Sequence, residues 1–331
     1  MKIIVTGGSG FIGRHLIEHL GDSGYQVVNV DIAPPALTSQ SFKSVWRKCS
    51  ILDGEALTEL FEREQPTYVV HLAAFASMDA KSMDEFRANT DGVSNVLSAC
   101  RRVSSLERLI VTSTQHVRRP GSGPPKSDTD FDSYMLYGKS KVITEELTRN
   151  AGLSCAWTIV RPTAVWGAHQ LVLADGLWRV MYRGRYFHPS RDRVVRSYGY
   201  VRNVVWQMER LLQAERGAVD QKVFYVADGN GLQVEWVNAF ARELTGRDVK
   251  TIPLVCIRIL SWVGDGFQRF GISFPIYSSR FKNLVTSNIV PIEPTMRLLG
   301  APPHSLDAGV NETVTWLKDY YAGKTVKCQS G

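Results

Sequence analysis

The chain has 331 residues, 44% hydrophobic and 21% charged, a balance typical of a globular protein with a sizeable core and contrary to global disorder. Lys and Arg number 39 against 32 Asp and Glu, and this net charge of +7 suggests anionic ligands without naming them. Five scattered cysteines with no CxxC pair, no signal-peptide pattern and no apolar run near 18 residues predict a cytoplasmic protein with no metal site and no transmembrane segment.

Short apolar, β-branched runs alternate with helical periodicity through the first two-thirds of the chain. The runs are typical of strands buried on both faces, and they predict strands at 2–6, 26–31, 68–73, 108–112 and 155–161. The segments between them predict helices at 11–20, 55–64, 83–102 and 134–150. This alternation predicts an α/β fold, a Rossmann-type doubly wound parallel sheet with ligands at the carboxyl ends of the strands.

The pattern changes after about residue 161. A loop is expected at 118–130, a strand at 222–227 and amphipathic helices at 233–245 and 306–320. We predict a first domain over 1–167 and a smaller C-terminal lobe over 168–331, from which segments such as 200–228 return to the core of the first domain. The apolar segment 253–274 is open to three interpretations: a lid, a packed helix or a membrane-facing surface.

A glycine-rich turn follows the first strand and opens the first helix, with the spacing GxxGxxG. Glycines there allow a tight turn and close approach of the backbone to a pyrophosphate, and the helix N-terminus offers free N–H groups to the phosphates. The residues predicted to hold a dinucleotide here are Gly7, Gly10, Phe11, Ile12 and Gly13.

Two carboxylates are candidates for the rest of the cofactor. Asp31 ends the second strand, where it can accept both ribose hydroxyls and repel a 2′-phosphate, so it favours NAD over NADP. Asp53 is a candidate acceptor for the adenine amine, and an ordinary solvated carboxylate is an equally good interpretation.

Tyr137 and Lys141 are four residues apart, so on a helix they share one face. The ammonium of Lys141 and a positive nicotinamide ring would favour the phenolate of Tyr137, although such a pair also occurs on ordinary helix surfaces. Ser113 and Thr114 end the preceding strand, where a hydroxyl can bond to a substrate hydroxyl or carbonyl.

Together these motifs resemble the extended short-chain dehydrogenase/reductase superfamily and, within it, the NAD-dependent epimerase/dehydratase family. The resemblance rests on TGGSGFIG (6–13), Asp31, HLAA (71–74), NVL (95–97), TST (112–114), YGKSK (137–141) and RP (161–162). It implies that Thr114 is the catalytic hydroxyl, Tyr137 the base and Lys141 its partner. The cofactor contacts that it implies beyond the glycine loop are Leu72, Ala73, Ala74, Asn89, Tyr137 and Lys141, and it also implies a homodimer through the helices at 83–102 and 134–150.

The chain departs from the family pattern near the substrate. Gln115 and His116 stand where dehydratases of the family carry an acidic pair, so 4,6-dehydration is disfavoured. Ala164 stands where 4-epimerases often have an Asn, which leaves the substrate open. His116 is either a substrate contact with acid/base character or a surface histidine.

The positive charge concentrates between residues 179 and 202, in seven arginines with one acid, Asp192. These arginines are Arg179, Arg183, Arg185, Arg191, Arg193, Arg196 and Arg202. Arginines interleaved with aromatic residues also occur in nucleic-acid binding, but no nucleic-acid motif is present, so we expect no such partner. Segment 196–201 resembles the family's Arg-x-Tyr-x-x-Val, which implies that Arg196 contacts a substrate diphosphate.

The function predicted from these features is an NAD-dependent enzyme acting on a nucleoside-diphosphate sugar, most simply a 4-epimerase with a transient keto intermediate. A net reductase or dehydrogenase of sugar nucleotides would use the same residues, and a hydroxysteroid-type dehydrogenase of the same superfamily is a further alternative. A redox-sensing binding module without turnover is disfavoured because both Tyr137 and Lys141 are present.

Overall fold

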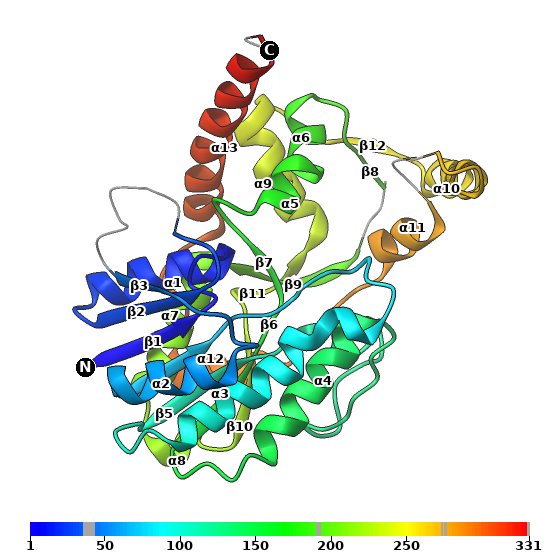
Figure 1. The fold of residues 1–331 in the computed structure, drawn as a ribbon. Coiled ribbons are helices and arrows are strands. Elements are labelled where there is room, and N and C mark those ends of the chain that lie inside the picture. Colours follow the sequence, from blue (N-terminus) through cyan, green and yellow to red (C-terminus); the bar gives the residue numbers. More distant parts are fainter. Residues whose placement is uncertain (36–43, 190–192, 273, 275–276, 330–331) are drawn as a thin grey trace. The chain divides into compact units, whose positions relative to one another are not determined.

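The computed structural model describes residues 1–35, 44–189, 193–272, 274 and 277–329 (Figure 1). The chain forms two compact units, and it passes between them several times. Unit 1 consists of Met1–Val165, Val201–Asp228 and Val290–Pro303, and unit 2 consists of Trp166–Tyr200, Gly229–Ile289 and His304–Gly331.

A seven-stranded sheet forms the centre of unit 1, with strand order β10-β6-β5-β4-β1-β2-β3 and every neighbouring pair parallel. Its strands are β1 (Lys2–Thr6), β2 (Gln26–Asp31), β3 (Ser44–Lys48), β4 (Tyr68–His71), β5 (Arg108–Thr112), β6 (Ala156–Pro162) and β10 (Lys222–Val226). This confirms the predicted doubly wound α/β fold. The sequence did not predict β3, because this edge strand is partly exposed and lacks a continuous apolar run.

Successive residues of a strand point to opposite faces of the sheet. Because residues on both faces are apolar here, helices cover both faces. Ile3 and Val5 belong to a core cluster with α1 (Phe11–Asp22) and α7 (Val201–Gln213). Ile4, between them, belongs to a second cluster with α2 (Gly54–Glu64) and α3 (Asp91–Arg101). The other helices of unit 1 are η2 (Met83–Asn89), η3 (Gln115–Val117), α4 (Leu136–Arg149), α8 (Arg216–Val219) and α12 (Glu293–Leu299).

The prediction of a single helix at 83–102 is wrong in one respect. The segment divides into the 3₁₀ helix η2 and the α-helix α3. Thr90 separates them, with φ −116° and ψ −77°. Asn89, just before the break, is fully buried and turns its amide to neighbouring segments. Apolar periodicity continues across the break, so it could not reveal this change of direction.

Unit 2 begins as β7 (Ala164–Trp166) leaves unit 1. Its elements are α5 (Leu171–Asp175), α6 (Leu177–Tyr182), β8 (Phe187–Pro189), β9 (Val195–Tyr200), β11 (Gly229–Leu232), α9 (Gln233–Thr245), β12 (Lys250–Ile252), α10 (Leu254–Arg269), α11 (Ser278–Val285) and α13 (Leu306–Gln329). Strand β9 pairs antiparallel with β11, and β8 pairs parallel with β12. In the described part of the chain, no helix is long and apolar enough to cross a membrane.

Aromatic side chains fill the core of unit 2. The ring of Trp166 lies 4.9 Å from Tyr200 and 5.4 Å from Phe240, measured between centroids. Gly309 of α13 packs against two of these rings: a Cβ there would lie 2.7 Å from Trp166 and 2.9 Å from Tyr200. The absence of a side chain at Gly309 therefore allows α13 to approach the aromatic core.

We expect Gly309→Ala to lower the free energy of unfolding by about 1–3 kcal/mol, because the added methyl group overpacks the aromatic core. Gly323→Ala, on the same helix, is the matched control, since a Cβ there meets no atom within 4 Å. Urea denaturation followed by circular dichroism measures both. Equal midpoints for the two variants would contradict the proposed close packing.

Candidate active site

The glycine-rich turn has the shape that a dinucleotide requires. Gly7 has φ +73°, and a Cβ on it would lie 2.6 Å from the backbone nitrogen of Ala73. A Cβ on Gly13 would overlap the carbonyl oxygen of Gly7. Gly10 precedes α1 and supplies no side-chain cap to its first N–H groups. The turn thus leaves backbone donors for an anion at the N-terminus of α1, as a bound pyrophosphate needs.

Asp31 is fixed at the end of β2, beside this turn. Its Oδ2 accepts the N–H of Ser9 at 3.0 Å, and its Oδ1 accepts the N–H of Ala33 at 3.0 Å. The carboxylate is held against the loop that carries the predicted pyrophosphate site. These positions fit an NAD ribose, and the predicted ribose contact itself remains a prediction.

Asp53 has a structural partner: its Oδ1 accepts the N–H of Ala56 at 3.1 Å and caps the N-terminus of α2. Such a cap contributes about 0.5–2 kcal/mol to helix stability. The exposed carboxylate of Asp53 thus has a role in the fold, and its contact with adenine stays a prediction.

The HLAA segment (71–74) begins at the last residue of β4 and continues next to the glycine turn. His71 Nδ1 lies 2.7 Å from Thr6 Oγ1, and Leu72 donates its N–H to the carbonyl of Thr6 at 3.0 Å. Burial, together with the positive charge of Lys141, lowers the pKa of His71 to about 3, so its ring is neutral at physiological pH. Ala73 then contacts Gly7, which brings the segment that was predicted to line the cofactor against the glycine turn.

Asn89 joins the segment after β4 to α4. Its Oδ1 accepts the N–H of Phe75 at 2.8 Å, and its Nδ2 donates to the carbonyl of Phe75 at 2.9 Å and to Ser140 Oγ at 2.8 Å. The amide therefore holds the backbone beyond Ala74 in place. A direct contact of Asn89 with the cofactor remains a prediction.

Tyr137 stands in the first turn of α4, with its hydroxyl near enough to Thr114, at the end of β5, for this side chain to lower its pKa. Its ring lies 6.3 Å from that of Phe86 and 6.2 Å from that of His116. Burial raises the pKa of Tyr137, and the hydrogen bond from Thr114 only partly opposes this. The protein groups around Tyr137 therefore favour the neutral phenol. That Lys141 and a bound nicotinamide ring together favour the phenolate stays a prediction.

Lys141 lies one turn further along α4, 2% exposed, and its Nζ donates to the carbonyl of Thr112 at 2.9 Å. Burial lowers its pKa to about 8, although the nearby carboxylate of Glu145 acts in the opposite direction. The ammonium thus loses its proton close to physiological pH.

His116 and Gly138 pack η3 against α4. A Cβ on Gly138 would overlap the carbonyl oxygen of His116 and Oγ of Ser133. Burial lowers the pKa of His116, and its buried Nδ1 has no partner among the described residues. His116 is therefore a neutral ring beside Tyr137 rather than a surface histidine, and its contact with substrate stays a prediction.

The sequence did not point to Glu145, although it follows Tyr137 and Lys141 at the same four-residue interval. Its carboxylate is fully buried and accepts two hydrogen bonds from the guanidinium of Arg161, at 2.8 and 2.7 Å. Ser113 donates to the same carboxylate at 2.6 Å. Burial lowers the pKa of Arg161, but the bonds and charge of Glu145 raise it more, so the guanidinium keeps its charge in the interior.

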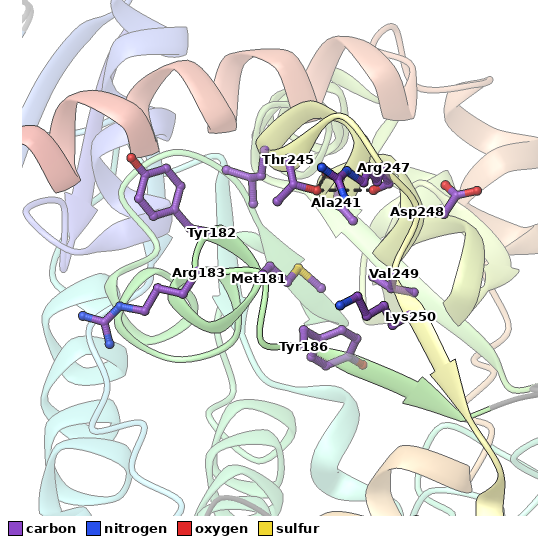
Figure 2. A pocket seen from close by; sticks show the side chains of 12 residues that line it. Met181, Tyr182, Arg183, Tyr186, Ala241, Thr245, Arg247, Asp248, Val249 and Lys250 are labelled. Carbon is purple, nitrogen blue, oxygen red and sulfur yellow. Dashed lines mark hydrogen bonds between the residues drawn. The ribbon is translucent and has the colours of Figure 1, made fainter.

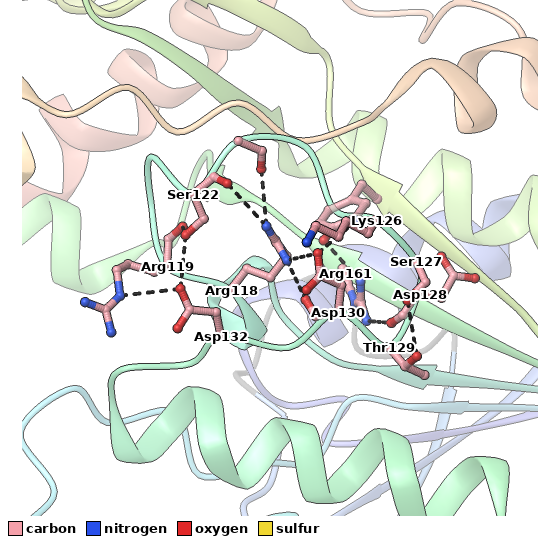
Figure 3. A network of polar contacts seen from close by, with 12 residues as sticks. Arg118, Arg119, Ser122, Lys126, Ser127, Asp128, Thr129, Asp130, Asp132 and Arg161 are labelled. Atoms are coloured by element: carbon pink, nitrogen blue, oxygen red, sulfur yellow. Dashed lines mark hydrogen bonds and ion pairs between the residues drawn. The ribbon is translucent and has the colours of Figure 1, made fainter.

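Arg161 also joins this pair to the loop after η3. Its Nη2 donates to the carbonyl of Asp128 at 2.6 Å, and its Nη1 donates to Tyr225 Oη at 3.1 Å. The loop is further closed on itself by an ion pair of 2.5 Å between Arg118 and Asp130 (Figure 3). The predicted loop at 118–130 is thus bonded to the core of unit 1 on one side and to itself on the other.

Arg196, in the arginine-rich segment 179–202, lies on β9 of unit 2. Its Nε donates to Gln233 Oε1 at 2.5 Å and its Nη2 donates to the carbonyl of Asn283. Arg202 belongs to α7 of unit 1, within 3.9 Å of Glu18, so the segment is divided between the two units. Arg191 and Asp192 lie outside the described residues.

Unit 2 contains a cavity of about 400 Å³ between the turn after α6 and the end of α9 (Figure 2). Basic and aromatic side chains border it, but none of the residues predicted for substrate lines it. Its lining is Met181, Tyr182, Arg183, Gly184, Tyr186, Ala241, Leu244, Thr245, Arg247, Asp248, Val249 and Lys250. Across the described residues, no group of three His, Cys, Asp or Glu side chains is placed to hold a metal ion.

A sequence model of the NAD-dependent epimerase/dehydratase family matches residues 3–227. A 4-hydroxy-2-methyl-3-oxo-4-farnesyl-3,4-dihydroquinoline-1-oxide ketoreductase of Stigmatella aurantiaca is 26% identical over 81% of this chain and 81% of its own. A UDP-glucose 4-epimerase of Azospirillum brasilense is 29% identical over 46% of this chain and 44% of its own. The solved UDP-glucose 4-epimerase of Thermotoga maritima superposes with a TM-score of 0.75 and 24% identity, over 97% of this chain and all (100%) of its own.

The fold and the glycine turn define an NAD-dependent enzyme of the Rossmann type. The chain belongs to the NAD-dependent epimerase/dehydratase family, whose model covers the parallel sheet of unit 1 from Ile3 onward. NAD is its cofactor, and the glycine turn and Asp31 fit that group.

The pKa of Lys141 gives a pH dependence. If its ammonium binds the nicotinamide ribose, affinity for NAD decreases as the pH rises through about 8, because the charge-assisted hydrogen bonds are lost. We expect roughly tenfold weaker binding at high pH, from the difference between charged and neutral hydrogen bonds. Calorimetric titration between pH 6.5 and 9.5 measures it.

Lys141→Met removes this pH dependence, whereas Lys139→Met, an exposed neighbour on α4, retains it. His71 does not titrate in this range, so it does not complicate the measurement. An unchanged pH profile in Lys141→Met would exclude the ribose contact.

Glu145→Gln keeps the shape of the side chain but leaves the buried Arg161 without its counter-ion. We expect a loss of about 3–5 kcal/mol in the free energy of unfolding, since a single buried charge remains. Glu146→Gln, the exposed neighbour on α4, should change it by less than about 0.5 kcal/mol. Urea denaturation compares the two, and similar losses in both would show that the ion pair does not hold the site.

Proposed function

We propose that this enzyme is a 4-epimerase of a nucleoside-diphosphate sugar. The observation that carries the chemistry is that Thr114 lies near enough to the Tyr137 hydroxyl to lower its pKa, at the carboxyl end of a central strand and in the same unit as the glycine turn. A base and a hydroxyl so placed can act together on one substrate hydroxyl.

In this proposal the hydroxyl at C4 of the sugar binds between Thr114 and Tyr137. Tyr137 removes its proton while the hydrogen on C4 leaves as a hydride, which gives a 4-keto sugar. NAD, held by the glycine turn and Asp31, would supply the hydride acceptor and donor. The keto sugar turns over between Thr114 and Tyr137, so that its carbonyl takes the hydride back on the opposite face. Tyr137 then returns the proton, so the sugar is inverted at C4 with no net oxidation.

The neutral phenol that burial favours must lose its proton before it acts as base. A positive charge near the hydroxyl lowers this cost, and Lys141, whose pKa is about 8, supplies it only below that value. Thr114 lowers the pKa of Tyr137 in the same direction through its hydrogen bond. His116, neutral beside the ring of Tyr137, offers a hydrogen-bonding nitrogen to the sugar.

For the diphosphate we propose Arg196. Gln233 and the carbonyl of Asn283 hold its Nε and Nη2, so the guanidinium is fixed before substrate binds. Its Nη1 has no protein partner among the described residues and is available to a phosphate oxygen. The partial match to the UDP-glucose 4-epimerase of Azospirillum brasilense is consistent with such a substrate.

A second candidate is a net NAD(H)-dependent reductase or dehydrogenase, of a sugar nucleotide or of an apolar alcohol such as a hydroxysteroid. The match to the ketoreductase of Stigmatella aurantiaca favours it, because this match extends over most of both chains. The same Tyr137 and Thr114 would serve, with proton and hydride transferred in one direction only.

We also propose that two copies of the chain form a homodimer through the segments 83–102 and 134–150, and that the protein is cytoplasmic.

Incubation with a panel of UDP-, dTDP- and GDP-sugars, with and without added NAD, tests the proposal. We expect a C4 isomer by NMR with no net NADH, and about a hundredfold or greater loss in Tyr137→Phe. Arg196→Met should raise KM about tenfold or more with little change in kcat, while Arg193→Met, at an exposed arginine of the same segment, should not. Net NADH formation or consumption, with sugars or with a hydroxysteroid, would overturn the epimerase in favour of the second candidate.

A further inference from the structure

Helix α10 of unit 2 exposes the side that carries its large apolar residues. Its buried positions are Ile257, Ser261 and Gly264, so only one of the three is a large apolar residue. A surface helix of a globular protein normally shows the opposite pattern, with its apolar stripe inward. The large apolar side chains exposed on α10 and just beyond it are Leu254, Val255, Ile259, Leu260, Trp262, Val263, Phe267, Phe270 and Ile272.

The apolar residues form one continuous arc. At 100° per residue, the side chains of Trp262, Val255, Ile259 and Val263 follow one another around the helix, opposite the buried stripe. The first three of them are 60%, 67% and 51% exposed, in that order. The arc continues past the helix end to Phe270, which is 83% exposed. Scattered apolar residues are normal on a surface, but an arc of this extent marks an interaction surface.

Positive charges border one edge of this arc. Arg258 and Arg269 are eleven residues apart, three turns, so they lie on the same edge of α10. The guanidinium of Arg258 lies over the ring of Trp262, at 5.8 Å from its centroid. Between Leu254 and Val285 the sequence has four basic residues and one acidic residue, Asp265, which accepts a bond from the N–H of Ser278 at 2.9 Å.

The apolar arc and its basic border show which kind of partner this face of α10 fits. A span across a bilayer needs about 20 apolar residues, and α10 has 16, with Arg258 among them. A purely apolar protein groove would not use the arginines at the border. A helix with tryptophan and phenylalanine on one face and arginine at its edge matches a lipid interface, where the apolar face enters the acyl boundary and the cations meet phosphate headgroups.

We propose that α10 docks in the plane of an anionic lipid bilayer, with Trp262, Ile259 and Phe270 inserted and Arg258 and Arg269 on the headgroups. The inference does not depend on which substrate the enzyme acts on. Of the three interpretations that the sequence left open for 253–274, it selects the membrane-facing surface.

The test is cosedimentation of the full-length protein with vesicles of phosphatidylcholine containing 30% phosphatidylglycerol. We expect binding that falls at least tenfold in Val255→Glu and in Phe270→Glu, since a carboxylate must enter the acyl boundary. Val172→Glu is the matched control: this valine of α5 in the same unit is 81% exposed, and its replacement should change binding less than twofold. Pure phosphatidylcholine vesicles, or 0.5 M salt, should reduce binding at least fivefold.

A label on α10 gives a second readout. Cys256 on α10 is exposed, whereas Cys100 and Cys155 are buried. Burial also raises the pKa of the Cys49 thiol, which makes it less reactive. In a Cys328→Ser variant, a thiol-reactive nitrobenzoxadiazole dye should therefore react at Cys256. The dye should shift to the blue and brighten on the anionic vesicles. The proposal would be overturned if the protein did not bind vesicles, or if Val172→Glu lost as much binding as Val255→Glu. It would also be overturned if sedimentation velocity showed that Val255→Glu dissociates a dimer formed by two α10 faces.

Discussion

A buried ion pair holds the site of this enzyme together. Glu145 is on α4, which carries Tyr137 and Lys141, and Arg161 is on β6, the neighbour of β5. The same two side chains bond to Ser113, just before Thr114, and to the loop after η3 through Asp128. Because charges in the interior are costly unless fully paired, this pair fixes the relative positions of helix, strand and loop with little freedom to adjust.

The parallel sheet supplies the second constraint. Its strands end together at one edge. The turn after β1, Asp31 at the end of β2 and the hydroxyls after β5 therefore come to one region of unit 1, although they are far apart in the sequence. Backbone contacts then set the fine distances, as where Gly7 meets Ala73. Backbone contacts thus shape the glycine turn, whereas buried side chains hold the proposed reacting groups in place.

The sequence predicted most of unit 1, because strands buried on both faces leave continuous apolar runs and a glycine-rich turn between strand and helix is typical of dinucleotide binding. It did not predict β3, an exposed edge, or the division at Thr90, where a buried amide redirects the chain without altering the apolar pattern. It missed Glu145, and it noted Arg161 within the RP motif without its partner, because the pairing of the two comes from burial, which charge patterns do not reveal. The direction of the Tyr137 pKa could not be predicted either, since it depends on how much water the fold removes.

Gly138 has a consequence for how such a site can change over time. The carbonyl of His116 occupies the space where any other residue would place its Cβ, so the distance from η3 to α4 is set by main chain against main chain. The side chain of His116 can therefore be exchanged without moving Tyr137 relative to Thr114. The proposed reacting pair and the residue proposed to face the substrate are therefore independent in the packing, so a scaffold of this kind can change one while it keeps the other.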